Sequence, residues 1–533
     1  MSASPEGKRI VFEARGELFN GPVKEGYVLN LTRSSGAFDM LPAWSPDGSQ
    51  IAYWSDASGE YQIYLQGSNG EEPPVQLSNR TKGFGYQLYC SPDSKKLCFV
   101  DETNDISVID VESKSTTVIA KSQWNLGHGS RYSFPIAWSP DSKWLTFSLG
   151  LNNSHGAIFL YSMENSSLHQ ATSGFYDDSR PLFSEDGKYL YYLTNRNMSA
   201  TYSDMGDGTW VYPNSTQLAV ISLTSDAPSL LKPKNDELKK EDDSEEKKDS
   251  AEDTKKESKK DSKKENKKES EEKPKENGEE VKIDLEGLES RIDILPPKAG
   301  NLIWLASFKG KVVYMRSPNT GSGSNSRSLV YYDLEEREEK TIISDVNAVK
   351  LTADGKMLLV NVKGKYGIIK AAENQKVDKP IPTGDLVMDL VPREEWQQIF
   401  NDTWRRYRDF FYDPQMHGLD WEKEKEQYGS LLKDARTRWD GSNLQSNMQA
   451  ELRAGHTYTF GGDVEQVLRK SSGFLGIDWE LSDKGYQIKR IVKPAAWDTQ
   501  VRSPFDKPGV DVKTGYYIHS VNGLSLDPQK DPY

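Results

Sequence analysis

One histidine stands out among the residues that could do chemistry. His456 follows a stretch with helical periodicity, in the string LRAGHTY at residues 452–458. It lies between a long array of β-repeats and a small module whose sequence is typical of peptide-end binding. An imidazole can act as a general base near neutral pH, so this position suggests hydrolytic chemistry on peptides. The alternative is that His456 packs or hydrogen-bonds between two domains without reacting.

No convincing nucleophile follows His456 in the sequence. The serines after it share a linker or module context, and they are Ser471, Ser472, Ser482, Ser503, Ser520 and Ser525. The other five histidines are scattered, without the HExxH spacing of a zinc site. Phosphate-binding and dinucleotide-binding glycine motifs are missing too. We therefore expect neither a metal nor a cofactor.

The elements that must position His456 begin with a repeat. Turn-forming strings recur at intervals of 41, 46, 48 and 45 residues, as SPEG at 4–7, SPDG at 45–48, SPDS at 91–94 and at 139–142, and SEDG at 184–187. Proline suits the second position of a tight turn, and Asp and Gly suit the next two. An alternating apolar strand follows each turn, and degenerate copies near residues 301 and 352 bring the units to seven.

A period of 40 to 50 residues built from short strands is typical of a β-propeller. We therefore predict a mainly-β fold, with a seven-bladed β-propeller over residues 1–385. A pair of irregular β-sandwiches is the alternative. Residues 234–280 are almost entirely Lys, Glu, Asp and Ser, and this composition predicts a disordered, solvated insertion within one blade.

Charge and cysteine content narrow the class of protein. The formal net charge of -13 argues against a partner of duplex nucleic acid. Cys90 and Cys98 fall in strand sequences and are expected to be buried free thiols. We find no signal peptide and no apolar run of bilayer length, which predicts a soluble chain with no membrane partner. The expected location is the cytoplasm, or the periplasm if a signal peptide has been lost.

After residue 385 the apolar period changes from two to 3.6, which predicts helices. Pro392 suits the first turn of one helix, and Asp420 is a candidate N-cap of a second. A third helix is predicted to start near Ser442 and to end with Gly455 as its C-cap. We expect a helical subdomain over residues 392–463, with His456 directly after a helix end.

The last segment, residues 472–533, is predicted to be a small β-rich module. It opens with a string that resembles the carboxylate-binding loop of PDZ domains: Gly473, Phe474, Leu475, Gly476 and Ile477. In such a loop, backbone N–H groups receive a peptide C-terminus while a strand edge accepts the extended chain. The later string IHSVNG fits a PDZ strand and its Asn-Gly turn. A PDZ fold needs more chain than this, so we expect an incomplete module; a plain hairpin without ligand is the alternative.

Taken together, several strings resemble the tricorn protease family of serine peptidases, over essentially the whole chain. They are FEARGE at 12–17, SDASGEY at 55–61, RDFFYDP at 408–414 with MHG at 416–418, and GIDW at 476–479. The resemblance implies that residues 1–385 are the seven-bladed propeller of the family and 392–463 its first catalytic subdomain. His456 then falls on the catalytic base of the family.

The same resemblance implies what these 533 residues lack. The family has a six-bladed propeller before this region. After the PDZ domain it has a second catalytic subdomain with the nucleophilic serine, the oxyanion hole and an acidic residue. The family also has serine directly before the histidine, where this chain has Gly455.

The implied function is serine-type hydrolysis of unfolded oligopeptides by a hexamer, and we expect this chain alone to be inactive. The alternative is a scaffold in which propeller and PDZ-like module bind peptides without chemistry. A TolB-like propeller would leave residues 392–533 without a place.

Overall fold

The computed structural model describes residues 1–123, 128–197, 202–204, 209–211, 213–233, 280–384, 386–464 and 473–530. These residues fall into two compact units, 1–460 and 461–533, and each is described by itself. The tract predicted to be disordered, 234–280, lies outside the described residues except for Glu280. Within the described ranges, no helix is long and apolar enough to cross a membrane.

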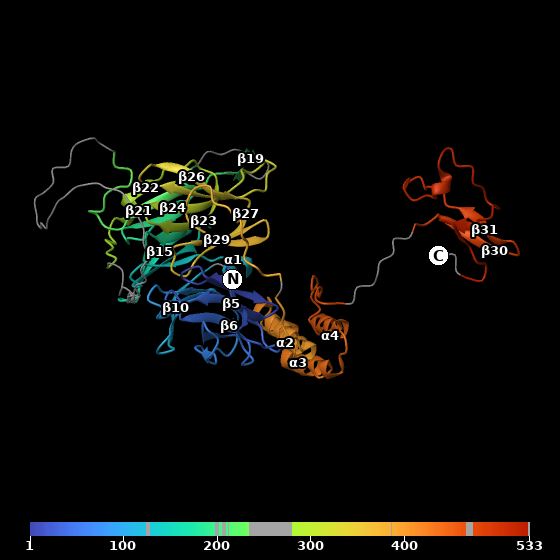
Figure 1. The fold of residues 1–533 in the computed structure, drawn as a ribbon, viewed down its shortest axis with the longest axis horizontal. Helices are drawn as coiled ribbons and strands as arrows, with labels where there is room; N and C mark the ends of the chain where they lie inside the picture. The colour runs from blue at the N-terminus through green and yellow to red at the C-terminus, as the bar shows by residue number, and fades with distance from the viewer. Residues whose placement is uncertain are drawn as a thin grey trace, which may run out of the picture. The chain divides into compact units, whose positions relative to one another are not determined.

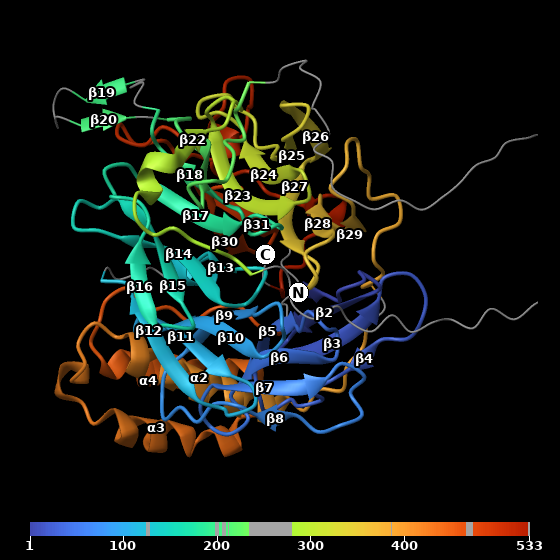
Figure 2. The ribbon, with the colours of Figure 1, turned by 90° about the vertical axis from the view of Figure 1, so that its left-hand side faces the viewer.

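The first unit is built around seven antiparallel sheets that succeed one another about a common centre (Figures 1 and 2). Blade one comprises β1 (Ser2–Ala3), β2 (Arg9–Ala14), β3 (Glu17–Pro22) and β4 (Leu29–Asn30). Blade two comprises β5 (Asp39–Trp44), β6 (Gln50–Ser55), β7 (Gln62–Gly67) and β8 (Val75–Gln76). Blade three comprises β9 (Gly85–Cys90), β10 (Lys96–Asp101), β11 (Asp105–Asp110) and β12 (Thr116–Lys121). Blade four, after the short α1 (His128–Tyr132), comprises β13 (Ile136–Trp138), β14 (Trp144–Gly150), β15 (Gly156–Ser162) and β16 (Ser167–Gln170).

The remaining blades complete the ring. Blade five comprises β17 (Asp178–Phe183), β18 (Tyr189–Thr194), β21 (Gln217–Ser222) and β22 (Ile292–Ile294). A separate hairpin of β19 (Tyr202–Asp204) and β20 (Thr209–Val211) lies between β18 and β21 in the sequence, and the 3-10 turn η1 (Leu288–Arg291) precedes β22. Blade six comprises β23 (Asn301–Phe308), β24 (Lys311–Ser317), β25 (Ser328–Asp333) and β26 (Glu338–Ser344). Blade seven comprises β27 (Val346–Leu351), β28 (Leu358–Val362) and β29 (Lys365–Ile369). The predicted mainly-β fold and seven-bladed propeller are confirmed, and the β-sandwich alternative is wrong.

The repeated turn explains why the propeller is visible in the sequence. In the turn at 45–48, the backbone N–H of Gly48 donates to the carbonyl of Ser45 at 2.9 Å, and this turn joins β5 to β6. The turns also contact each other, because the N–H of Asp47 donates to Ser94 Oγ (3.2 Å) and that of Asp93 to Ser142 Oγ (3.1 Å). One short motif therefore closes a hairpin within each blade that carries it and links blades two, three and four.

Large side chains fill the space between blades. Between blades two and three, the Trp54 and Phe99 rings meet edge to face at 5.3 Å, and Trp54 Nε1 donates to the carbonyl of Tyr86 at 2.7 Å. Gly85 leaves room for this indole, since a Cβ there would lie 2.0 Å from Trp54 Cζ2. The close approach of a buried tryptophan thus requires glycine at this strand position.

The helical segment belongs to the first unit. It comprises α2 (Pro392–Phe410), the 3-10 turn η2 (Met416–Gly418), α3 (Trp421–Gly429), the 3-10 turn η3 (Leu432–Asp434) and α4 (Arg438–Glu451). Its core includes Trp404 and Trp421, whose indole N–H groups each donate to the carbonyl of the other residue, at 2.8 and 3.1 Å. The predicted Pro392 start is confirmed. So is the Asp420 cap, whose carboxylate accepts from the N–H of Lys423.

The predicted bounds of the third helix are wrong. α4 starts four residues earlier than expected, because Thr437 and Asp440 form a capping box. The sequence signal was weak because aspartate replaces the usual Glu or Gln of this motif. Gly455 does not cap the helix either. Leu452 is the C-cap, and Arg453 takes the left-handed conformation (φ 52°).

The second unit contains two small hairpins. β30 (Ile477–Ser482) pairs with β31 (Gly485–Ile491), and β32 (Ser520–Val521) pairs with β33 (Leu524–Ser525), with the 3-10 turn η4 (Pro504–Asp506) between them. Asn522 and Gly523 join β32 to β33 with φ of 51° and 79°. Positive φ at both central residues is the mark of a type I′ turn, so the predicted Asn-Gly turn is confirmed.

Candidate active site

Helix α2 docks onto the turn between β6 and β7, the two middle strands of blade two, through buried charges. The guanidinium of Arg405 contacts the carboxylate of Asp56, and its Nη1 donates to the carbonyl of Gly59 at 2.6 Å. Arg405 and Asp56 are each 5% exposed. One turn further on, Arg408 holds the Glu60 carboxylate in a bidentate pair at 2.6 and 2.8 Å. Because buried ions are stable only when paired, these contacts fix α2 against the propeller.

Further contacts extend this seam, which we define as the contacts of α2 with residues 12–61. The hydroxyl of Tyr61 donates to Asp402 Oδ1 at 2.9 Å, and Arg15 pairs with Glu395 at 2.6 Å. The strings at 12–17 and 55–61 therefore both contact α2, and Glu60 pairs with Arg408 of the string at 408–414, although more than 340 residues separate the partners in each contact. Three of the strings that distinguish the sequence are the parts that join the helical segment to the propeller.

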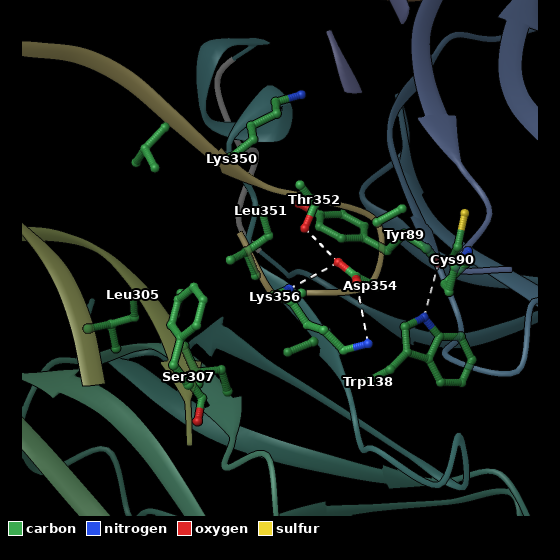
Figure 3. Close-up of a pocket in the computed structure, with 18 of the residues that line it drawn as sticks. Tyr89, Cys90, Trp138, Leu305, Ser307, Lys350, Leu351, Thr352, Asp354 and Lys356 are labelled. Carbon is green, nitrogen blue, oxygen red and sulfur yellow. Dashed lines mark hydrogen bonds and ion pairs between the residues drawn. The ribbon is translucent and has the colours of Figure 1, made fainter. Parts of the chain in front are cut away.

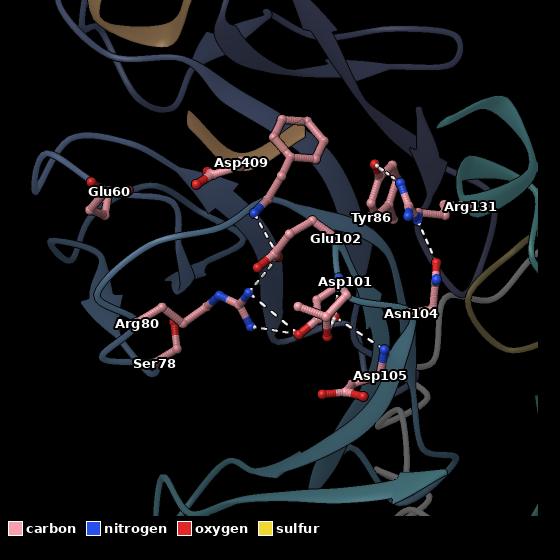
Figure 4. A network of polar contacts seen from close by, with 12 residues as sticks. Glu60, Ser78, Arg80, Tyr86, Asp101, Glu102, Asn104, Asp105, Arg131 and Asp409 are labelled. Atoms are coloured by element: carbon pink, nitrogen blue, oxygen red, sulfur yellow. Dashed lines mark hydrogen bonds and ion pairs between the residues drawn. The ribbon is translucent and has the colours of Figure 1, made fainter. Parts of the chain in front are cut away.

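A second polar network supports the seam from within blades two and three (Figure 4). Arg80 contacts the carboxylates of Asp101 (3.4 Å) and Glu102 (2.9 Å). Glu102 also accepts from the N–H of Phe84 at 2.9 Å. Desolvation by burial raises the pKa of Glu102, while the Arg80 charge opposes the shift. The network holds Phe84, whose ring meets that of Phe410 at the end of α2 at 6.1 Å.

The segment that carries His456 is fastened on both sides. Before it, His417 Nδ1 lies 2.7 Å from the carbonyl oxygen of Leu452, and the other ring nitrogen contacts the Tyr412 hydroxyl. After it, Thr459 Oγ1 donates to Gln449 Oε1 at 3.1 Å. The residues between 452 and 459 thus form a loop attached to η2 at one end and to α4 at the other.

His456 itself lies on this loop with an exposed imidazole and a φ of 61°. This left-handed conformation is uncommon for a residue other than glycine, and such residues gather at functional sites. Nδ1 lies 3.1 Å from the hydroxyl oxygen of Tyr458. Nε2 has no hydrogen-bond partner within the part of the chain that the structure describes. The Tyr458 hydroxyl can either donate to Nδ1 or accept from Nδ1–H, and in the tautomer with Nδ1–H the open Nε2 is the nitrogen that can accept a proton.

The residue before His456 is not constrained by packing. A Cβ at Gly455 would meet no heavy atom within 4 Å, and the backbone there is outside the left-handed region. A serine side chain would fit this position. The supporting residues His417, Gln449 and Tyr458 were not predicted, because nothing in a single sequence links them to His456.

The loop predicted to bind peptide ends is held against Ser503. Gly476 has a φ of 60°, and a Cβ there would lie 2.8 Å from the Cα of Ser503. Ser503 Oγ donates to the carbonyl of Leu475 at 2.5 Å, while Phe474 is 74% exposed. β30, which follows this loop, pairs with β31 on one edge and with no strand of the described residues on the other. An open strand edge beside such a loop could accept an extended peptide.

A channel along the axis of the propeller forms a cavity with a volume of about 1250 Å³ (Figure 3). The inner strands of all seven blades contribute to its wall. Cys90 lies in this wall as a half-buried free thiol, and Cys98 is a fully buried one. Burial raises the pKa of the Cys90 thiol to about 12, which keeps it protonated and unreactive as a nucleophile.

Family models account for each part of the chain. Residues 1–372 match the second beta propeller domain of tricorn protease, residues 392–450 its C1 domain and residues 473–533 its PDZ domain. The chain belongs to the tricorn protease family. The resemblance inferred from the sequence strings is therefore confirmed, and the second unit is a PDZ domain of this family.

Individual relatives agree with this assignment. The chain is 26% identical to tricorn protease homolog 1 of Streptomyces coelicolor, over all of its own length and 49% of that protein. It is 23% identical to the tricorn protease of Thermoplasma acidophilum, over 99% of its length and 46% of that protein. The crystal structure of the tricorn protease has a TM-score of 0.69 at 19% identity, covering 100% of this chain and 48% of that one, and shows the same fold. The chain thus spans about half the length of these relatives.

Proposed function

We propose that this chain supplies the general base and the peptide-handling domains of a serine peptidase that acts on oligopeptides. The base is His456, and the nucleophilic serine and acidic residue lie on a segment outside these 533 residues. The supporting observation is the state of the imidazole, with Nδ1 beside a hydroxyl and Nε2 open on a loop fastened at both ends. A catalytic base needs this fixed geometry and one free nitrogen.

In this mechanism Nε2 takes the proton of the serine hydroxyl as its oxygen attacks the peptide carbonyl. The imidazolium then gives the proton to the leaving amine. The Tyr458 hydroxyl accepts from Nδ1–H and keeps the ring in the productive tautomer. Tyr458 would thereby take over an orienting role for which Gly455 has no side chain.

The other domains handle the substrate. The propeller channel admits extended oligopeptides and excludes folded proteins, because about 1250 Å³ is far too little for a folded domain. The PDZ loop formed by Gly473, Phe474, Leu475, Gly476 and Ile477 holds a peptide carboxylate on its backbone N–H groups. We further propose assembly into a hexamer, as in the family, with unfolded peptides as the substrates.

Fluorophosphonate labelling tests the assignment. This chain should not be labelled, because its serines after residue 456 lie in the linker and the PDZ domain; Ser503, for example, is fully buried and bound to Leu475. The enzyme that includes the missing segment should be labelled at one serine, and His456→Ala should slow that reaction by about 10³-fold or more. Labelling of any serine in this chain would contradict the proposal. An extended protein that binds peptides but is never labelled would instead be a scaffold.

A further inference from the structure

The wall of the propeller channel carries an excess of positive charge. Two carboxylates, Glu185 and Asp354, line it. The cationic side chains that line it number six: Arg180, Lys309, Lys311, Lys350, Lys356 and Lys370. This balance is opposite in sign to that of the whole chain, whose formal net charge is -13. A narrow cavity between protein walls concentrates the field of such charges.

Among these six cations only Lys356 has a carboxylate partner within the described residues, and Arg180 and Lys350 are two of the five without one. Lys356 pairs with Asp354 at 3.4 Å, and Lys311 Nζ lies 4.4 Å from the centre of the Tyr331 ring. In contrast, neither Arg180 nor Lys350 has a carboxylate partner within the described residues. Figure 3 shows the pair of Asp354 and Lys356 and, apart from it, Lys350 with no marked contact.

The surroundings of Arg180 and Lys350 disfavour the charged form of each side chain when no anion is near. Arg180 is half-buried and Lys350 is exposed towards the channel, and partial desolvation by the surrounding walls lowers the pKa of both groups. Arg180 is also presented by an irregular strand, because its φ is 54° and the register of β17 shifts between Ser179 and Leu182. An anion in the channel would restore to both groups the charge interaction that they lack.

The shape and lining of the channel indicate which kind of anion would enter. Every inner strand is the first of its sheet, so its inner edge carries backbone groups that face the channel rather than another strand of the sheet. Aromatic side chains stand between these edges, among them Trp44, Trp138 and Trp304. Strand edges and aromatic walls suit an extended polypeptide.

We infer that the channel selects acidic peptides, with Arg180 and Lys350 as the residues that contact their Asp and Glu side chains. This inference rests on the proposed passage of peptides through the propeller and adds a side-chain preference to it. The selectivity concerns entry and does not depend on the reaction at His456. It therefore applies to this chain by itself.

Fluorescence anisotropy with three decapeptides tests the inference. The peptides carry four Glu, four Gln or four Lys in one Ala/Ser/Gly host and bear the same neutral dye. Acetylated and amidated ends remove the free carboxylate that the PDZ loop would hold. The Glu peptide should bind this chain at least tenfold more tightly than the Lys peptide. Raising the salt from 50 to 500 mM should reduce that ratio, because exposed charges are screened.

Substitutions test which residues of the channel wall cause the preference for the Glu peptide. Arg180→Gln and Lys350→Gln should each weaken binding of the Glu peptide about threefold to fivefold, the range for a solvated ion pair, and leave the Gln peptide unchanged. Lys350→Arg should retain the preference. Lys24→Gln, which removes the same charge from a residue outside the channel wall, should have no effect.

The possible outcomes separate this inference from the function on which it rests. Equal binding of the three peptides, or a preference that persists in the double variant Arg180→Gln with Lys350→Gln, would overturn the charge selectivity and leave peptide passage intact. Failure of all three peptides to bind would overturn both. Circular dichroism of each variant shows whether it folds. If a glutamine variant does not fold, the salt dependence of the Glu-to-Lys binding ratio in the unsubstituted chain decides, because a ratio that does not fall at 500 mM salt would contradict the charge selectivity.

Discussion

Replacing Arg405 with methionine should release α2 from the propeller. Arg405 is 5% exposed, contacts the Asp56 carboxylate, and places its guanidinium carbon 5.2 Å from the centre of the Tyr61 ring. Methionine fills much of the same volume but leaves Asp56 as a buried charge without its cation. Removing one partner of a buried ion pair costs about 3–5 kcal/mol. The equilibrium constant for release of α2 from the propeller should therefore increase by a factor of about 10² to 10³ or more.

Hydrogen exchange measured by mass spectrometry reads this equilibrium directly. Peptides from α2, residues 392–410, should lose protection by that factor, while peptides from blades five and six should not change. The matched control is Arg15→Met, which breaks the more exposed pair with Glu395. A solvated pair contributes about 1 kcal/mol or less, so the control should change exchange by fivefold at most.

A double variant separates a lost contact from an unpaired charge. Asp56→Asn together with Arg405→Met leaves no buried ion, so the pair should destabilise the seam less than Arg405→Met alone. Equal effects of Arg405→Met and Arg15→Met would refute the role given to the buried pair. So would a double variant whose cost equals the sum of the two single costs.

Three other predictions concern the propeller and the loop of His456. Desolvation by burial raises the pKa of Asp39 to about 7, so between pH 4 and pH 7 the folded state binds a proton that the unfolded state has lost. The free energy of unfolding should therefore fall by up to about 4 kcal/mol from pH 4 to pH 7. Urea midpoints of the Asp39→Asn variant should not show this decrease with pH. Gly85→Ala should destabilise the propeller by about 1–3 kcal/mol in urea titrations, because the new Cβ meets the Trp54 ring, whereas Gly129→Ala, with nothing within 4 Å, should not. In the enzyme that includes the missing segment, Tyr458→Phe should lower kcat by about tenfold at unchanged KM, because one hydrogen bond to His456 is lost. Adding Gly455→Ser to this variant should recover part of the lost kcat. Full activity of Tyr458→Phe would rule out an orienting role for Tyr458.

The propeller could be predicted because its signal is local and repeated. Each turn closes over four residues, and its Ser, Pro, Asp and Gly act within that span, as in the bond from Gly48 to Ser45. The seam could not be predicted in the same way. Arg405 and Asp56 are 349 residues apart, and a single sequence gives no sign that two such distant charges share one buried site.

The candidate site was predicted only in its central residue. His456 was identified by its position between modules and by the family resemblance. The contacts that hold its loop join residues that no local pattern connects, such as His417 and Leu452. The bounds of α4 were misplaced because Thr437 and Asp440 cap it without the usual glutamate. Local chemistry thus predicts elements, whereas the support of the site depends on contacts between them.

The most direct test is the rate of peptide hydrolysis with and without the His456 imidazole. In the enzyme that includes the missing segment, His456→Ala should lower kcat by about 10⁴-fold or more, with KM nearly unchanged, because the base acts only in the transition state. His155→Ala, which alters a half-buried histidine of the propeller, is the matched control and should leave kcat unchanged. A His456→Ala enzyme that keeps kcat within tenfold of the wild type would contradict the assignment of His456 as the base.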